Sequence, residues 1–148
     1  MADVSRSRTI AATPATIWEV LADFASLSAW ADGLDHSCVI HNGRDADPLG
    51  LTRRVQVGRD PFVETITAFA PPRLLAYDIA GVPPAMSAAN RWTLSPQGDS
   101  RTTVTLTSTV RMKPHPLRAI AERAGAHLVA RRSEALLDSL AKHCEEKA

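Results

Sequence analysis

The sequence predicts an α+β fold in which a curved, mostly antiparallel sheet of about six to seven strands wraps around a long C-terminal helix. Three observations predict this fold. Apolar and polar residues alternate through much of the middle of the chain, which is the period of a β-strand. The connections between these segments are too short for parallel crossovers. The last third, from Pro116 to about Cys144, has helical spacing and would cover the sheet.

The first elements should be one strand and two short helices. Val4 to Ala11 alternates moderately, as a strand does. Thr13 and Pro14 then supply an N-cap and a favoured first helical residue, so a helix should start there. Asp23 and Phe24 open a second short helix.

The period then changes to two, and clusters of Pro, Gly, Asn and Asp mark the breaks. The clearest strand is Thr102 to Met112, where Val, Leu and Ser alternate with threonine. One face of this strand should therefore be buried, and the other should be a threonine ladder in water. The other expected strands lie at Ser37–His41, Leu51–Gly58, Phe62–Phe69, Leu74–Ala80 and Ala88–Leu94.

The long C-terminal helix begins with an apolar stripe. Leu117, Ile120, Ala121, Ala124 and Leu128 are three or four residues apart, so they share one side of a helix. We expect this side to pack on the sheet.

Length and composition exclude several classes of protein. The 148 residues suit one domain, 1–148, with a substantial core. A formal net charge of +1 argues against a general polyanion binder, so no nucleic acid partner is expected. No apolar run is long enough to cross a membrane, so we expect no stable membrane insertion and a cytoplasmic location.

The sequence also lacks the spacings of common metal and cofactor sites. Cys38 and Cys144 stand alone, and the five histidines are dispersed, so we expect reduced structural thiols and no metal site. GxSxG, Walker and GxGxxG motifs are absent, and no cofactor is expected.

Several segments carry a resemblance to a known family. They are Ile10 to Phe24 with Leu27 and Trp30, Glu64 to Thr67, Pro71 to Tyr77, and Trp92 to Leu94. The chain resembles the START-like helix-grip (SRPBCC) superfamily, in its polyketide cyclase/dehydrase-like branch. This resemblance implies a cavity between the concave sheet and the long helix that holds a hydrophobic or amphipathic ligand. The superfamily includes lipid carriers, polyketide binders, aromatase/cyclases and interaction proteins, so it implies the fold more specifically than the function.

Glu64 is the candidate for chemistry, because strand alternation places it on the same face as Ile66 and Ala68. A carboxyl group among apolar side chains loses hydration in its charged form and can become a general acid or base. The alternative is a structural ion pair with an arginine. Arg53 and Arg54 are adjacent on a strand, so one of them faces each way, and either could meet Glu64.

Arg132 lies within the later apolar stripe of the long helix, between Leu128 and Leu136. Its guanidinium group could bind a ligand carboxylate or phenolate. Alternatively, its aliphatic stem covers the core while the charged group reaches water, and we favour this interpretation because arginine is seldom fully buried.

The other candidate ligand-binding residues are aromatic or polar positions on the expected concave side: Trp30, Tyr77, Asn90, Trp92 and Ser108. Aromatic residues with a polar tip suit a pocket for a ring-containing ligand. For Trp92, plain core packing is the stronger interpretation. The loop Gly81 to Met86 is either a lid over the cavity or a long hairpin connection.

Three functions follow from these observations. The leading hypothesis is a protein that binds a small hydrophobic or aromatic molecule, such as a lipid, polyketide or related metabolite. The second is a cyclase/dehydrase-type enzyme in which Glu64, with Arg132 or Tyr77, assists proton transfer. The third is a stress- or ribosome-associated interaction protein, which the ordinary net charge weakens.

Overall fold

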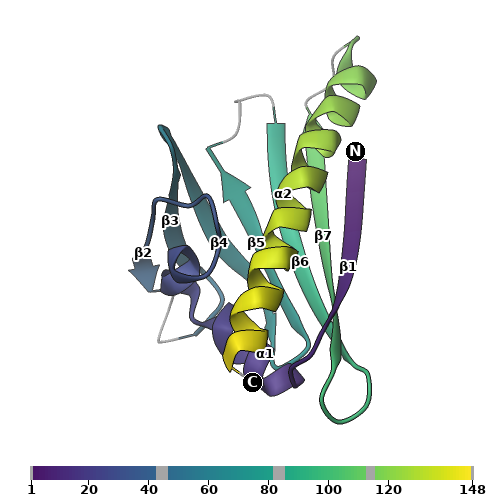
Figure 1. The fold of residues 1–148 in the computed structure, drawn as a ribbon. Helices are drawn as coiled ribbons and strands as arrows, with labels where there is room; N and C mark the ends of the chain where they lie inside the picture. Colours follow the sequence, from purple (N-terminus) through teal and green to yellow (C-terminus); the bar gives the residue numbers. More distant parts are fainter. Residues whose placement is uncertain (1, 43–46, 82–85, 113–115, 148) are drawn as a thin grey trace.

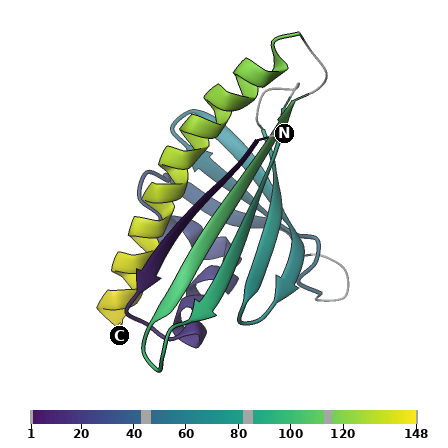
Figure 2. The ribbon, with the colours of Figure 1, turned by 90° about the vertical axis from the view of Figure 1, so that its right-hand side faces the viewer.

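The computed structural model describes residues 2–42, 47–81, 86–112 and 116–147 of the chain. A curved sheet lies on one side, and a long helix crosses its concave face (Figures 1 and 2). In chain order, the elements are β1 (Ala2–Ile10), α1 (Pro14–Ala22), the 3-10 helix η1 (Phe24–Ala29), β2 (His36–Asn42), β3 (Leu51–Val57), β4 (Asp60–Ala70), β5 (Leu74–Ala80), β6 (Met86–Pro96), β7 (Thr102–Met112) and α2 (Arg118–Lys147).

The seven strands form one sheet in the order β1-β7-β6-β5-β4-β3-β2, and each neighbouring pair is antiparallel. The predicted α+β helix-grip fold is therefore confirmed, including the two short helices after the first strand. Thr13 caps α1 as expected, because its side chain accepts a hydrogen bond of 3.2 Å from the Thr16 backbone N–H.

β7 alternates as predicted. Val104 and Leu106 are fully buried, while the threonines between them lie on the outer face. These threonines are not simply in water, because Thr105 and Thr107 share hydrogen bonds of 2.7 and 2.9 Å with two serines of β1. The outer ladder therefore also holds the edge strand in register.

The prediction of which side of the first turns of α2 packs on the sheet is wrong. Leu117, Ile120 and Leu128 have relative exposures of 58%, 69% and 64%. The helix instead buries the opposite side, on which Ala130 is 7% exposed and Ser133 is 2% exposed. Four of the five residues of the predicted stripe thus lie on the surface.

The sheet-facing side of this part of α2 carries small residues. At Gly125, a Cβ atom would lie 3.1 Å from Met86 Cε and 3.5 Å from Val110 Cγ1. A helix can approach a sheet this closely only where its side chains are small, and Ala130 and Ser133 continue that face. Leu117, Ile120 and Leu128 lie on the outer side instead.

The later turns of α2 bury larger apolar groups on the same face. Leu137, Leu140, Ala141 and Cys144 are buried and join a cluster with residues of β1, α1, β6 and β7. This apolar cluster closes one end of the space between helix and sheet, and the middle of α2 lies over the other end.

Candidate ligand cavity

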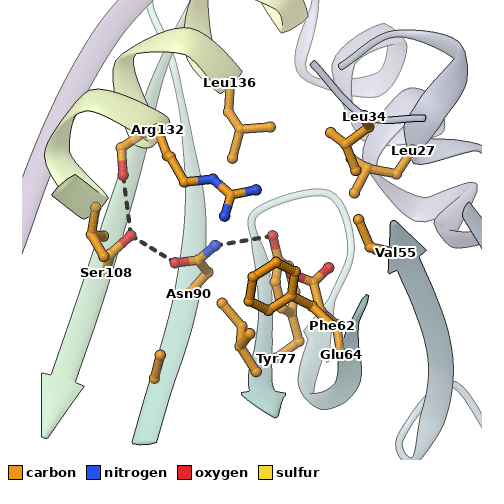
Figure 3. A pocket seen from close by; sticks show the side chains of 14 residues that line it. Leu27, Leu34, Val55, Phe62, Glu64, Tyr77, Asn90, Ser108, Arg132 and Leu136 are labelled. Carbon is orange, nitrogen blue, oxygen red and sulfur yellow. Dashed lines mark hydrogen bonds between the residues drawn. The ribbon is translucent and has the colours of Figure 1, made fainter. Parts of the chain in front are cut away.

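A cavity of about 110 Å³ lies between the middle of α2 and the concave face of the sheet (Figure 3). Its apolar lining comes from η1, the loop after it, β3 to β6 and α2: Leu27, Leu34, Val55, Phe62, Ile79, Ala88, Val129 and Leu136. Its polar lining consists of Glu64, Tyr77, Asn90, Ser108, Arg132 and Ser133. The cavity therefore combines an apolar wall with a polar one.

A hydrogen-bond chain runs along the polar wall (Figure 3). Ser133 and Ser108 are 3.2 Å apart, and the Ser108 hydroxyl donates to Asn90 Oδ1 at 2.6 Å. The Asn90 amide then donates to the Tyr77 hydroxyl oxygen at 3.3 Å, and Trp92 Nε1 donates to the same oxygen at 3.1 Å. The chain thus links α2 to three neighbouring strands and ends on the Tyr77 oxygen.

The environment of Tyr77 keeps its hydroxyl group protonated. Burial raises the pKa of Tyr77 above its ordinary value, because the phenolate would lose its hydration, and the negative charge of Glu64 raises it further. Arg53 and the two hydrogen bonds from Asn90 and Trp92 act in the opposite direction. At neutral pH Tyr77 is a neutral phenol at the cavity wall.

Glu64 lines the cavity and forms a buried ion pair with Arg53, which lies directly opposite on β3. Arg53 Nε and Nη2 lie 2.7 and 2.6 Å from Glu64 Oε1. The same guanidinium group donates to the Phe24 carbonyl at 3.0 Å and stacks 3.7 Å from the centre of the Phe24 ring. The ion-pair interpretation of Glu64 therefore holds, and Arg53 rather than Arg54 is the partner.

Arg132 lies at the rim of the cavity. It is an exposed residue, and its guanidinium carbon lies 5.3 Å from the centre of the Phe62 ring across the opening. Its side chain lines the cavity, and Figure 3 shows its guanidinium group directed into the pocket, toward Asn90 and Phe62, so both interpretations of Arg132 stay predictions.

The structure brings five of the seven predicted ligand-binding residues together. Glu64, Tyr77, Asn90, Ser108 and Arg132 all line the cavity. Their contact with a ligand remains a prediction.

The two predicted tryptophans do not belong to this lining. Trp30 and Trp92 are 7% and 1% exposed, and their rings pack edge to face with centres 6.3 Å apart. Trp92 still acts on the site, since its indole N–H bonds to the Tyr77 oxygen. The core interpretation of Trp92 is therefore correct.

Sequence reasoning did not place Phe62, Ser133 or the other apolar lining residues at the site, and it named Arg53 only as one of two possible partners of Glu64. Arg53 could have been found only with the pairing of β3 and β4, in which it stands opposite Glu64. The possible lid residues between Gly81 and Met86 lie outside the described residues.

Neither a metal cluster nor a membrane span is found in the described parts of the chain. Their His, Cys, Asp and Glu side chains form no group of three that could hold a metal ion. Among the described helices, none is both long and apolar enough to cross a membrane.

Residues 1–145 match the family model described as polyketide cyclase / dehydrase and lipid transport, so the chain belongs to that family. No curated protein matches the sequence significantly. Among solved structures, the Zhui aromatase/cyclase from a Streptomyces species is 20% identical, with a TM-score of 0.81 over 99% of this chain and 94% of that one.

Two further solved structures are similar. A START superfamily protein from Mycobacterium smegmatis has 20% identity and a TM-score of 0.74 over 99% of both chains. A norcoclaurine synthase mutant from Thalictrum, solved with a transition-state analogue, has 15% identity and a TM-score of 0.74, covering 99% of this chain and 96% of that one. At these identities the similarity concerns the fold, which is START-like.

Proposed function

We propose that this protein binds a small hydrophobic or aromatic molecule in the cavity beneath α2. The observation that carries the proposal is the division of the cavity into an apolar wall and one polar wall whose hydrogen bonds converge on the Tyr77 oxygen. An apolar pocket with a few convergent polar groups is typical of a small-molecule site.

The cavity volume favours a ligand with one ring at its buried end. An engineered protein cavity of roughly 150 Å³ holds benzene, and the cavity here is about 110 Å³. A larger lipid or polyketide would place only one end inside and leave the rest at the rim, beside Arg132 and Phe62. Because Tyr77 accepts two hydrogen bonds, its own hydrogen is left to donate to a carbonyl or hydroxyl oxygen of the ligand.

The comparisons support this class of ligand. The family description names polyketides and lipid transport, and the Zhui protein is titled an aromatase/cyclase. We carry over the class only: a binder of a polyketide, lipid or related metabolite.

The test uses native mass spectrometry of the purified protein, followed by titration with single-ring phenols and with longer amphipathic molecules. Ala88→Leu fills the cavity from β6, while Ala89→Leu adds the same volume on the outer face of that strand. We expect Ala88→Leu to weaken binding about tenfold or more, a change of about 1.4 kcal/mol, and Ala89→Leu to leave it unchanged. Equal affinities in the two variants, or no binding by the wild type, would overturn the proposal.

A second candidate is proton-transfer catalysis on a bound carbonyl compound. It is favoured by one observation: both contacts of Arg53 use Glu64 Oε1, which leaves Oε2 to act as a base in the cavity that Tyr77 also lines. Glu64→Gln keeps the shape and an acceptor for Arg53. Turnover that disappears in this variant while ligand affinity is retained would favour the enzyme. An absence of turnover in the wild type would leave ligand binding as the supported function.

A further inference from the structure

The outward side of the first turns of α2 carries an apolar stripe. Ile120 and Leu128 are 69% and 64% exposed, Leu117 is 58% exposed, and the exposed Ala124 lies between them. We name Leu117, Ile120, Ala124 and Leu128 the outer stripe, because helical spacing places them on one line along the helix. A contiguous exposed apolar patch marks an interaction surface, whereas single exposed leucines need no explanation.

Basic side chains border the outer stripe. Arg123 and Arg131 are exposed, and neither forms an ion pair with a described residue. The acidic residue of these turns, Glu122, is 6% exposed on the sheet side. Exposed acids occur farther along the helix, at Glu134 and Asp138, where they pair with arginines of β1. The stripe is thus an apolar surface with a positive border.

The outer stripe adjoins the rim of the cavity. Val129 and Arg132, which line the cavity, follow Leu128 by one and four residues on the same helix. The first turns of α2 extend beyond the ends of the strands (Figures 1 and 2). A surface that touched these turns would therefore also lie near Val129 and Arg132.

We propose that the outer stripe docks the protein reversibly on a bilayer that contains anionic lipids. The leucine and isoleucine side chains would enter the interface, and Arg123 and Arg131 would meet lipid phosphates, as in amphipathic helices that lie on membranes. A second copy of this chain fits less well. Pairing two outer stripes would bring the arginines of both copies together, with no exposed acid on these turns to offset them.

Docking would bring the part of α2 that lines the cavity close to the bilayer, which would shorten the path of an apolar ligand between membrane and cavity. This delivery role rests on the proposed function, but the docking itself does not. Vesicle binding is therefore measured without any cavity ligand, and ligand affinity is measured without vesicles, so either proposal can fail alone.

The experiment is co-sedimentation of the protein with vesicles of phosphatidylcholine, alone or mixed with phosphatidylglycerol. We expect binding to the mixed vesicles that weakens in high salt, because exposed charges are screened. Ile120→Gln with Leu128→Gln should weaken binding by about tenfold or more. Arg123→Gln with Arg131→Gln should weaken it and reduce its salt dependence.

Two matched pairs serve as controls. Ile40→Gln with Leu49→Gln removes two aliphatic side chains that are 53% and 47% exposed elsewhere on the surface. Arg91→Gln with Arg101→Gln removes the same charge from exposed positions outside α2. Both controls should bind vesicles like the wild type. Three results would overturn the proposal: no binding to mixed vesicles, equal losses in stripe and control variants, or a wild-type dimer that the stripe variant converts to a monomer.

Discussion

The space between α2 and the sheet has two ends of opposite character. At the closed end, Leu137, Leu140 and Cys144 of α2 are buried in an apolar cluster with α1 and the strands. At the cavity end, the same face of the helix carries Ser133, which meets the buried polar groups of Asn90 and Ser108. One helix therefore seals the fold with its later turns and covers a cavity with its middle turns.

The two ends use buried surface for different purposes: one for stability and the other to form a cavity. The closed end gains its stability from apolar burial, which is strongest where the packing is complete. The cavity end gives up part of that packing and holds its polar groups by hydrogen bonds and one buried ion pair. Substitutions at the two ends should therefore differ in how they divide their effects between stability and ligand binding.

The largest loss of stability should follow from breaking the buried ion pair at the cavity end. Glu64→Ala would leave the Arg53 charge buried at 3% exposure without its carboxylate. Removing one partner of a buried pair costs about 3–5 kcal/mol, which urea unfolding would measure. Glu64→Gln is the control and should lose less, because it keeps an acceptor. A loss below about 1 kcal/mol for Glu64→Ala would show that the pair is hydrated.

A substitution at the closed end should change the stability of the protein and leave its ligand binding unchanged. Leu140 is fully buried, and Leu→Ala changes in protein cores cost about 2–5 kcal/mol. We expect the folded fraction of Leu140→Ala to keep the ligand affinity and the Tyr77 pKa of the wild type, which calorimetry and absorbance titration would check. A loss of affinity in fully folded Leu140→Ala would mean that the two ends are coupled.

The strands and the start of α1 could be predicted from the sequence, because their residue patterns are local. The alternation of β7 and the Thr13 cap each depend on a few neighbouring residues. The orientation of α2 could not be predicted in this way. Its outer stripe has the better apolar period, yet Gly125 lies close to Met86 and Ser133 is buried, so small residues and not the large apolar residues of the outer stripe face the sheet.

The sequence predicted several of the residues that line the site, but it did not predict which residues they contact. Strand alternation was enough to place Glu64 and Asn90 on the concave face. The partners come from strand register and from α2, as Arg53 opposite Glu64 and Ser133 beside Ser108 illustrate. Such long-range pairing is not encoded in any one segment.

A smaller effect, dependent on pH, should distinguish the polar wall from the apolar core. Tyr77 is the only tyrosine in the chain, so the ultraviolet absorbance of tyrosinate reports its titration directly. Since its pKa is raised, the midpoint in the folded protein should lie above about 10 and return to about 10 in denaturant.

The sign of the linked stability change follows from proton binding. As the pH rises past about 10, the unfolded tyrosine loses its proton before the folded one does. The unfolded state then binds fewer protons, so the free energy of unfolding falls with rising pH. Tyr77→Phe should remove this contribution and cost about 1–3 kcal/mol at neutral pH, because the donors of Asn90 and Trp92 lose their acceptor. A folded-state midpoint at or below about 10 would mean that Tyr77 is hydrated.

The smallest effect is expected on the outward side of α2, and it supplies the sharpest comparison with the closed end. Leu128→Ala removes the same atoms from the same helix as Leu140→Ala, but Leu128 is 64% exposed and Leu140 is fully buried. Surface substitutions of this kind change stability by less than about 0.5 kcal/mol, so urea unfolding should separate the two variants clearly. Equal losses would mean that Leu128 is covered in solution, and the orientation of the first turns of α2 would then have to be revised.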